Sequence, residues 1–323
     1  MHPILFTLPW LDFPVRSFGL MLALGFLLGS TIFNKLVARH SKDPAQDVER
    51  YGAIPVWVLI GIVLGARLLY VIVEVSRYRS ALGAHPLMTN ELAVQLGVST
   101  GREYLADPLQ MLLVWKGGLV MYGGFIGGIV GGTWCAKRHK LRIRHAVDLG
   151  ITAGFFGQAV GRIGCLLVGD DFGSRVGDGA KASWLHWRPI VLGDGGEIGP
   201  FTIRVPNLTA TGHLPEGSLF GDENAGQVLW ATQPLMSLKA LIVASIALWV
   251  LKHRRYEGQV ALVAVLIYAL MRFAIEFLRG DNIRGVWFDG AISTSQMLSI
   301  AGACIATILL LKNWNRRDAP LAA

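Results

Sequence analysis

Seven apolar segments, each close to the length needed to cross a bilayer, set the first limit on how this chain folds. They lie near residues 17–38, 53–75, 113–134, 146–168, 234–252, 259–278 and 291–311. A helix needs about 20 apolar residues to cross the hydrocarbon core, and a helix satisfies all its backbone polar groups within one segment. We therefore predict an all-α integral membrane protein with seven transmembrane helices.

The composition favours a membrane protein over a soluble one. Of the 323 residues, 53% are hydrophobic and 16% are charged, whereas about 25% charged residues is usual in soluble domains. The net charge of +8 comes from short basic clusters between apolar segments, which anionic lipid and membrane orientation explain better than nucleic acid. The three cysteines are scattered and lack CxxC spacing, so they indicate neither a disulfide framework nor a metal site.

Basic residues concentrate in the first, third and fifth loops and in the C-terminal tail. They are Arg39, Lys42, Arg50, Lys137, Arg138, Lys140, Arg142, Arg144, Lys252, Arg254, Arg255, Lys312, Arg316 and Arg317. By the positive-inside rule these loops face the cytoplasm and the N-terminus faces out. We treat residues 1–323 as a single membrane domain with extracytoplasmic insertions at about 76–112 and 169–233. The second insertion is rich in Gly, Pro, Trp and acidic residues, and we expect it to form a small cap.

Ionisable residues within the predicted spans point to a functional site. Arg67, Arg162, Arg272 and Glu276 are such residues. Insertion scales put the cost of a charge at the bilayer centre at about 2.5–3.5 kcal/mol, so these side chains should be paired or line a wet cavity. For Arg67 the sequence leaves three roles open. Its side chain can extend to the membrane interface, pair with Glu74 or contact a lipid headgroup.

The sixth span carries Tyr268, Arg272, Glu276 and Arg279 at offsets of four, four and three residues. This spacing places them on one helix face. One interpretation is a salt-bridged stripe that packs against another helix. The other is an anion site within the membrane, in which Glu276 orients Arg272 or Arg279. Arginine suits phosphate because its planar fork donates two parallel hydrogen bonds.

Glycines shape the third and fourth spans. In the third, two GxxxG ladders run through residues 123, 127, 131 and 124, 128, 132, a pattern typical of close helix packing in lipid. In the fourth, Gly161 and Gly164 flank Arg162, and Asp170 and Gly173 follow. A tight helix crossing explains these glycines but not an arginine at that depth.

Short motifs follow one another along nearly the whole chain. They are RSFGLM at 16–21, GARL at 65–68, WKGGL and YGGFIGG between 115 and 128, GRIG at 161–164, YxxxRxxxExxRGD at 268–281, and SQ at 295–296. In this order they resemble the motifs of the prolipoprotein diacylglyceryl transferase family of bacterial inner membranes. The chain departs from the family pattern at Tyr122, where many members have His, and at Phe18, Cys165, Val168 and Asp170.

The resemblance implies a transferase that moves the diacylglyceryl group of phosphatidylglycerol to the lipobox cysteine of preprolipoproteins. It implies the catalytic residues Arg162, Arg272, Tyr122 and Glu276. It implies phosphatidylglycerol binding by Arg162, Arg272, Tyr268, Arg279, Gly161, Gly164, Asp170, Gly173, Arg67 and Phe18. The proton acceptor stays open between Tyr122, Asp170 and water, and no metal or organic cofactor is expected.

The implied partners are phosphatidylglycerol and the signal peptides of preprolipoproteins, with no nucleic acid. The implied location is the bacterial inner membrane, with the active site near the outer leaflet. Two alternatives remain: a small membrane transporter or channel, and a family member with lost or altered activity. Charge concentrated in the outer part of the fourth span and near the ends of the sixth favours a lipid headgroup site over a transport path.

Overall fold

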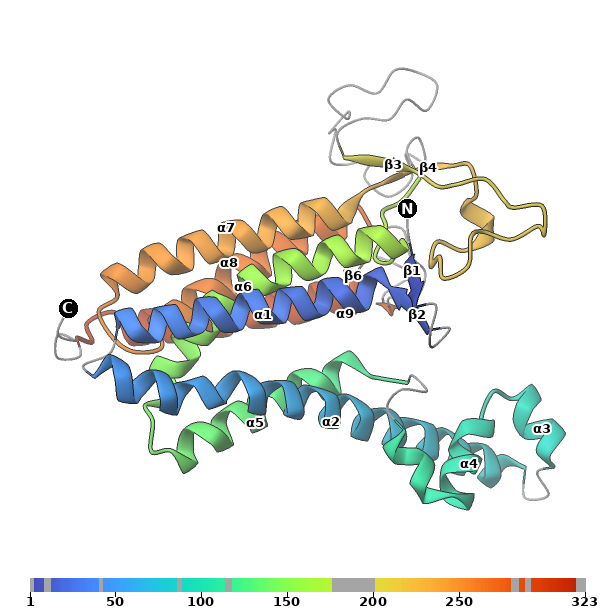
Figure 1. The fold of residues 1–323 in the computed structure, drawn as a ribbon, viewed down its shortest axis with the longest axis horizontal. Coiled ribbons are helices and arrows are strands. Elements are labelled where there is room, and N and C mark those ends of the chain that lie inside the picture. The colour runs from blue at the N-terminus through green and yellow to red at the C-terminus, as the bar shows by residue number, and fades with distance from the viewer. Residues whose placement is uncertain are drawn as a thin grey trace. The chain divides into compact units, whose positions relative to one another are not determined.

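The computed structural model describes residues 3–8, 13–40, 43–85, 89–113, 118–175, 201–279, 285–287 and 292–317. Its seven long helices are α1 (Ser17–Arg39), α2 (Pro44–Ala84), α5 (Met121–Arg138), α6 (Ile143–Val168), α7 (Thr232–His253), α8 (Gln259–Glu276) and α9 (Thr294–Lys312) (Figure 1). Each predicted apolar segment corresponds to one of them. The prediction of a helical membrane protein is therefore confirmed.

Among the described residues, every long helix except α5 is long and apolar enough to cross a membrane, which gives six candidate spans. Helix α5 has 18 residues, and the two glycine ladders occupy a third of it. Glycine adds little hydrophobicity, which explains why α5 is not among these six candidate spans. A seventh crossing by α5 stays a prediction.

Short elements connect these helices. They are α3 (Asn90–Gln95), α4 (Ser99–Ala106), η1 (Pro108–Leu112), η3 (Asp222–Asn224) and three antiparallel strand pairs: β1 (Ile4–Leu8) with β2 (Phe13–Arg16), β3 (Thr202–Arg204) with β4 (Val228–Trp230), and β5 (Val286–Trp287) with β6 (Ile292–Ser293). Within the expected cap, β3, β4 and η3 surround a small core of Val205, Leu214, Phe220 and Leu229. Residues 176–200 of that insertion lie outside the described residues.

Helix α2 is longer than the predicted span at 53–75. It begins at Pro44, where Asp43 accepts a hydrogen bond from the backbone of Gln46 at 3.4 Å, and it ends at Ala84. The insertion expected at 76–112 therefore starts inside a helix and continues as α3, α4 and η1. Bilayer thickness limits the apolar part of a helix but not its whole length.

The chain divides into two compact units, residues 37–146 and residues 1–36 with 147–323. In the first unit, α2 packs closely on α5 through glycine. A Cβ added at Gly61, Gly65 or Gly127 would collide with the backbone of the facing helix. The ladder at 123, 127 and 131 faces α2 backbone, and the ladder at 124, 128 and 132 faces α2 side chains. The structural interpretation of both ladders is confirmed.

The second unit contains α6, α7, α8 and α9 with most of α1. Gly25 of α1 meets Gly157 of α6 backbone to backbone. Asp148 of α6 is fully buried and accepts hydrogen bonds from Arg254 at 2.7 Å and from the backbone of Gly258 and Ala261 at 2.8 and 3.0 Å. These bonds tie α6 to the loop before α8 and cap the start of that helix. The opposite ends of α6, α7 and α8 carry the candidate site.

Candidate active site

The chain leaves α6 through a short turn, Gly169, Asp170 and Asp171, which we call the acidic turn. Gly169 has φ of 79° and lies against the Phe220 ring, so a side chain at this position would be both strained and blocked. The backbone N–H groups of Gly169 and Asp170 both donate to the carbonyl of Cys165, at 2.9 Å. Glycine at the end of α6 therefore allows two carboxylates to follow the helix directly.

The start of α7 holds the acidic turn by its backbone. Gln233 Nε2 donates to the carbonyl of Asp170 at 2.6 Å, and the hydroxyl of Thr232 donates to the carbonyl of Asp171. Thr232 and Gln233 are fully buried. Because these bonds use main-chain atoms of the turn, the side chain of Asp171 stays available for ion pairs.

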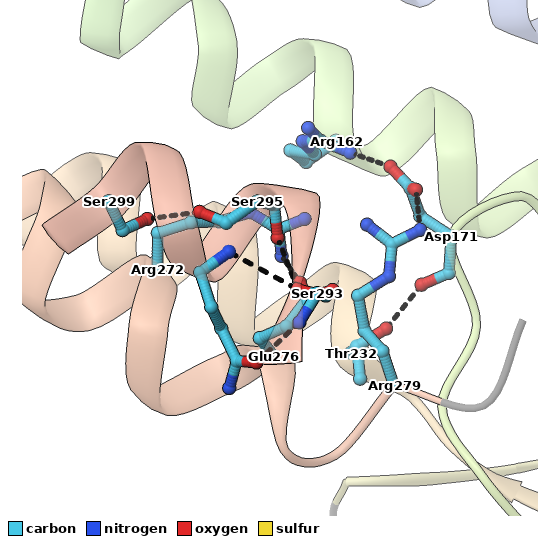
Figure 2. A network of polar contacts seen from close by, with 10 residues as sticks. Arg162, Asp171, Thr232, Arg272, Glu276, Arg279, Ser293, Ser295 and Ser299 are labelled. Atoms are coloured by element: carbon cyan, nitrogen blue, oxygen red, sulfur yellow. Dashed lines mark hydrogen bonds and ion pairs between the residues drawn. The ribbon is translucent and has the colours of Figure 1, made fainter. Parts of the chain in front are cut away.

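Asp171 joins two arginines from different parts of the chain. Its carboxylate bonds to Arg162 of α6 and, through the other oxygen, to Arg279 just after α8, with Nη2 at 2.5 Å (Figure 2). Burial raises the pKa of the Asp171 carboxyl, but the charges of Arg162 and Arg279 outweigh burial and hold that pKa below its ordinary value. Asp171 is therefore ionised at neutral pH.

Arg272 and Glu276 form a second ion pair one turn apart on α8. The Nη1–Oε2 distance is 2.7 Å, and Glu276 is 2% exposed. Of the two partners expected for Glu276, the structure shows Arg272, while Arg279 bonds to Asp171. Part of the α8 stripe is therefore an internal salt bridge, between Arg272 and Glu276. The other part, Arg279, pairs with Asp171, which follows α6.

The site brings three guanidinium groups together. Three guanidinium groups, of Arg162, Arg272 and Arg279, face the carboxylates of Asp171 and Glu276. Burial, together with the neighbouring Asp171 charge, raises the pKa of the Asp170 carboxyl. An anion is the ligand that such a cluster favours.

An apolar cavity of about 280 Å³ adjoins Arg162. Its other lining residues are Ile163, Leu166, Gln233, Pro234, Ser237, Leu238 and Leu241. Charge beside the cavity and hydrocarbon along its walls match a ligand that is both anionic and apolar.

The glycines predicted to bind substrate differ in their surroundings. Gly173 bonds to the carbonyl of Trp230 at 2.7 Å, and a Cβ there would press on the carbonyl of Leu278 at 2.7 Å. A Cβ at Gly164 would lie 3.4 Å from the Phe18 Cα of α1. A Cβ at Gly161 would meet nothing within 4 Å. Gly173 and Gly164 thus allow close packing, and Gly161 leaves open space beside Arg162.

A family model for prolipoprotein diacylglyceryl transferase matches residues 3–312. The chain belongs to the prolipoprotein diacylglyceryl transferase family. Relatives with this activity in their names are similar to the chain in sequence along almost its full length. The chain is 27% identical to the phosphatidylglycerol–prolipoprotein diacylglyceryl transferase of Geobacter sulfurreducens, over 93% of this chain and 90% of the relative. It is also 27% identical to that of Stenotrophomonas maltophilia, over 95% and 90%, and 25% identical to transferase 2 of Clostridium perfringens, over 88% and 86%.

Two residues expected to act in this transferase family member, Arg67 and Tyr122, belong to the unit of residues 37–146. Arg67 donates to the carbonyls of Gln110 and Met111, both at 2.8 Å, and of Gly118 at 3.3 Å. These bonds hold the segment before α5. Tyr122 lies in the first turn of α5 and is 46% exposed. Their roles toward lipid and proton stay predictions.

The SQ motif at 295–296 has a structural explanation in this transferase family member. The hydroxyl of Ser293 accepts from the backbone of Gln296 at 3.2 Å, and Gln296 Oε1 accepts from the backbone of Ser293 at 2.9 Å. This capping box fixes the start of α9 beside Arg272 and Glu276 (Figure 2).

Sequence reasoning did not select Asp171, Thr232 and Lys239, which the structure places among these arginines. Asp171 follows Asp170 directly, and only the turn geometry shows which carboxylate faces the arginines. Lys239 lies in the apolar segment 234–252. A charged residue is costly within a membrane span, so this position alone could have marked Lys239 as a candidate site residue. Nothing in the sequence singles out Thr232.

Proposed function

We propose that this protein transfers the diacylglyceryl group of phosphatidylglycerol to the lipobox cysteine thiol of preprolipoproteins, the first step of bacterial lipoprotein maturation. One observation carries the proposal: Arg162 and Arg279 both bond to Asp171, and an apolar cavity adjoins Arg162. Arg272, paired with Glu276 on α8, adds a third guanidinium group. Family membership supplies the reaction, and this cluster supplies a place for its phosphate.

The reaction exchanges one bond at the glyceryl carbon. The cysteine sulfur attacks the carbon that carries the phosphate, a C–S bond forms, and the C–O bond breaks with its electron pair going to the phosphate oxygen. Glycerol phosphate leaves. Negative charge therefore grows on the leaving phosphate, and Arg162 and Arg272 stabilise it in surroundings that screen charge weakly.

The carboxylates hold the arginines in place. Asp171 fixes Arg162 and Arg279, and Glu276 fixes Arg272. Cations that are already in place need little rearrangement when charge develops on the phosphate. Such positioning therefore raises the rate of transfer. Arg279 and Tyr268 complete the lipid site. Gly164 and Gly173 allow Phe18 and the backbone to lie close to it, and Gly161 leaves space beside Arg162.

The thiol, with an ordinary pKa near 8.5, must lose its proton before attack. Tyr122, Asp170 and water are the candidate acceptors. Burial, with the nearby charge of Asp171, raises the pKa of the Asp170 carboxyl, which makes it a stronger base than an ordinary carboxylate. We place Asp170 first and keep Tyr122 and water as alternatives.

We further propose seven crossings with the N-terminus outside, in the cytoplasmic membrane, and with the site near the outer leaflet. Lys252 and His253 lie in the last turn of α7, and the acidic turn is held at its first turn. The positive-inside rule puts the basic end in the cytoplasm, so the site falls toward the outer side.

Complementation of a bacterial strain depleted of its own transferase tests this proposal. We expect the wild-type chain to restore growth and thioether formation. We expect Arg162→Ala and Arg272→Ala to reach the membrane in normal amounts without restoring either, while Arg50→Ala, an exposed arginine at the start of α2, behaves as wild type. A wild-type chain that inserts normally and leaves the strain without lipidated protein would contradict the proposal and favour altered chemistry.

A further inference from the structure

Lys239 is a buried cation that the mechanism above does not use. It lies on α7, is 1% exposed, and its Nζ lies 3.8 Å from the centre of the Tyr268 ring. Within the described parts of the chain it has no hydrogen-bond acceptor and no ion-pair partner, although it interacts electrostatically with Arg272, Arg162 and Asp171. The ring face attracts the ammonium but accepts none of its three N–H donors in a conventional hydrogen bond.

The position of Lys239 relative to the arginines follows from two helices. On α8, Tyr268 precedes Arg272 by four residues, about 6 Å along the axis. On α6, Phe155 packs on Tyr268 with ring centres 5.5 Å apart, and it precedes Arg162 by seven residues, about 10 Å. The ring that holds the ammonium therefore belongs to residues one to two helical turns before the arginines on α8 and α6. Arg272 and Arg162, in contrast, pair with partners toward the helix ends, Glu276 and Asp171.

A phospholipid bound with its phosphate at the arginines offers one kind of acceptor near that ring. Its glycerol backbone continues from the phosphate toward the acyl chains and carries two ester carbonyl oxygens. A lysine kept only for solubility extends its charge toward the polar end of the helix, whereas Lys239 turns its ammonium onto an aromatic ring inside the bundle.

We propose that Lys239, held over Tyr268, binds the ester carbonyl oxygens of the diacylglyceryl group and so selects diacyl over dialkyl lipids. This inference rests on the proposed function, because that function places the phosphate at the arginines. The esters remain in the thioether product, so this subsite holds the lipid before and after the phosphate leaves.

The test compares two lipids on purified protein in detergent micelles: dioleoyl phosphatidylglycerol and its diether counterpart, in which both ester carbonyls are absent. For the wild type we expect kcat/KM to be at least tenfold higher with the diester, the size of one hydrogen bond to a charged group. For Lys239→Met, similar in length but without donors, we expect the two lipids to react within about twofold of each other. Lys252→Met, an exposed lysine at the end of the same helix, should keep the wild-type preference.

A wild type that uses both lipids equally, or a Lys239→Met variant that keeps the full preference, overturns the inference. An equal loss with both lipids also overturns it, because it assigns Lys239 to the phosphate or to folding. If the variant is too slow to assay, thermal stabilisation by dioleoylglycerol and by its diether is measured instead. The same preference must appear in the wild type and disappear in the variant. This binding measurement also separates failure of the subsite from failure of the transferase proposal, since it requires no turnover.

Discussion

Asp171 holds guanidinium groups from two elements, and the chemistry proposed here depends on that carboxylate. Arg162 and Arg279 come from different parts of the chain, and each bonds to one of its oxygens. Loss of the charge would remove one ion-pair partner from each of these two buried arginines.

We expect Asp171→Asn to lower kcat for diacylglyceryl transfer by about 10²-fold, the effect of small misplacements in preorganised sites. Labelled phosphatidylglycerol and a lipobox peptide provide the assay. Glu216→Gln, an exposed acid of the cap, serves as control and should match the wild type. Equal rates for Asp171→Asn and wild type would remove the carboxylate from the mechanism.

The pH dependence of transfer distinguishes the candidate proton acceptors. Burial, aided by the Asp171 charge, raises the pKa of Asp170, so its carboxylate is lost as pH falls through a value above the ordinary 3.9. If Asp170 accepts the thiol proton, kcat/KM falls on that acid side. Asp170→Asn should then show low activity without that acid limb. An acid limb of unchanged position in Asp170→Asn would assign the role to Tyr122 or water.

At this scale the sequence predicted part of the site. The cost of a buried charge singled out Arg162, Arg272 and Glu276, and the structure pairs each of them. The same reasoning applied to Lys239 would have found it. Asp171 differs, because two adjacent acids look alike in sequence and only the ion pairs in the structure show which of them meets the arginines.

At the scale of elements, close helix contacts depend on glycine. The α2–α5 contact in one unit and the α1–α6 contact in the other both bring backbones together where no Cβ intervenes. Without a hydrophobic drive between helices in lipid, this close packing is a main source of association.

We expect Gly127→Val to lower the midpoint of thermal unfolding in detergent, because the added side chain collides with the backbone of Gly61 and Gly65. Overpacking of this kind costs about 1–3 kcal/mol or more. Gly154→Ala is the control: a Cβ there meets nothing within 4 Å, and alanine favours the helix. A Gly127→Val protein as stable as wild type would show that the ladder is not a packing contact.

Apolar length predicted which segments are helical but not where the helices end. Helix α2 continues from Pro44 to Ala84, well beyond the predicted 53–75, because polar turns extend a helix past the hydrocarbon without changing its apolar count. The strand pairs are two to five residues long, which is too short for a periodicity to be read from sequence.

At the scale of the whole molecule, the arrangement in the membrane follows from charge. Basic residues lie in the last turns of α1, α5, α7 and α9, and by the positive-inside rule we propose that these four ends face the cytoplasm. The sequence predicted this orientation from loop composition alone, since lysine and arginine are counted without any coordinates. Which carboxylate meets which arginine depends on three-dimensional packing, and loop composition carries no such information.

We expect an epitope inserted at Gly212, in a turn of the cap with open space around it, to be accessible from outside intact cells. An epitope inserted at Lys140, between α5 and α6, should become accessible only after permeabilisation. Both insertions must retain transferase activity for the comparison to hold. Accessibility of the two epitopes from the same side would contradict the orientation.

The central claim is that Arg162 and Arg272 stabilise the charge that develops on the leaving phosphate. The most direct measurement is the single-turnover rate of thioether formation from phosphatidylglycerol and a lipobox peptide, at saturating lipid, for the wild type, Arg162→Ala and Arg272→Ala. The account predicts that each variant folds, binds lipid and forms product about 10²–10³-fold more slowly. A rate within tenfold of wild type for either variant would contradict it.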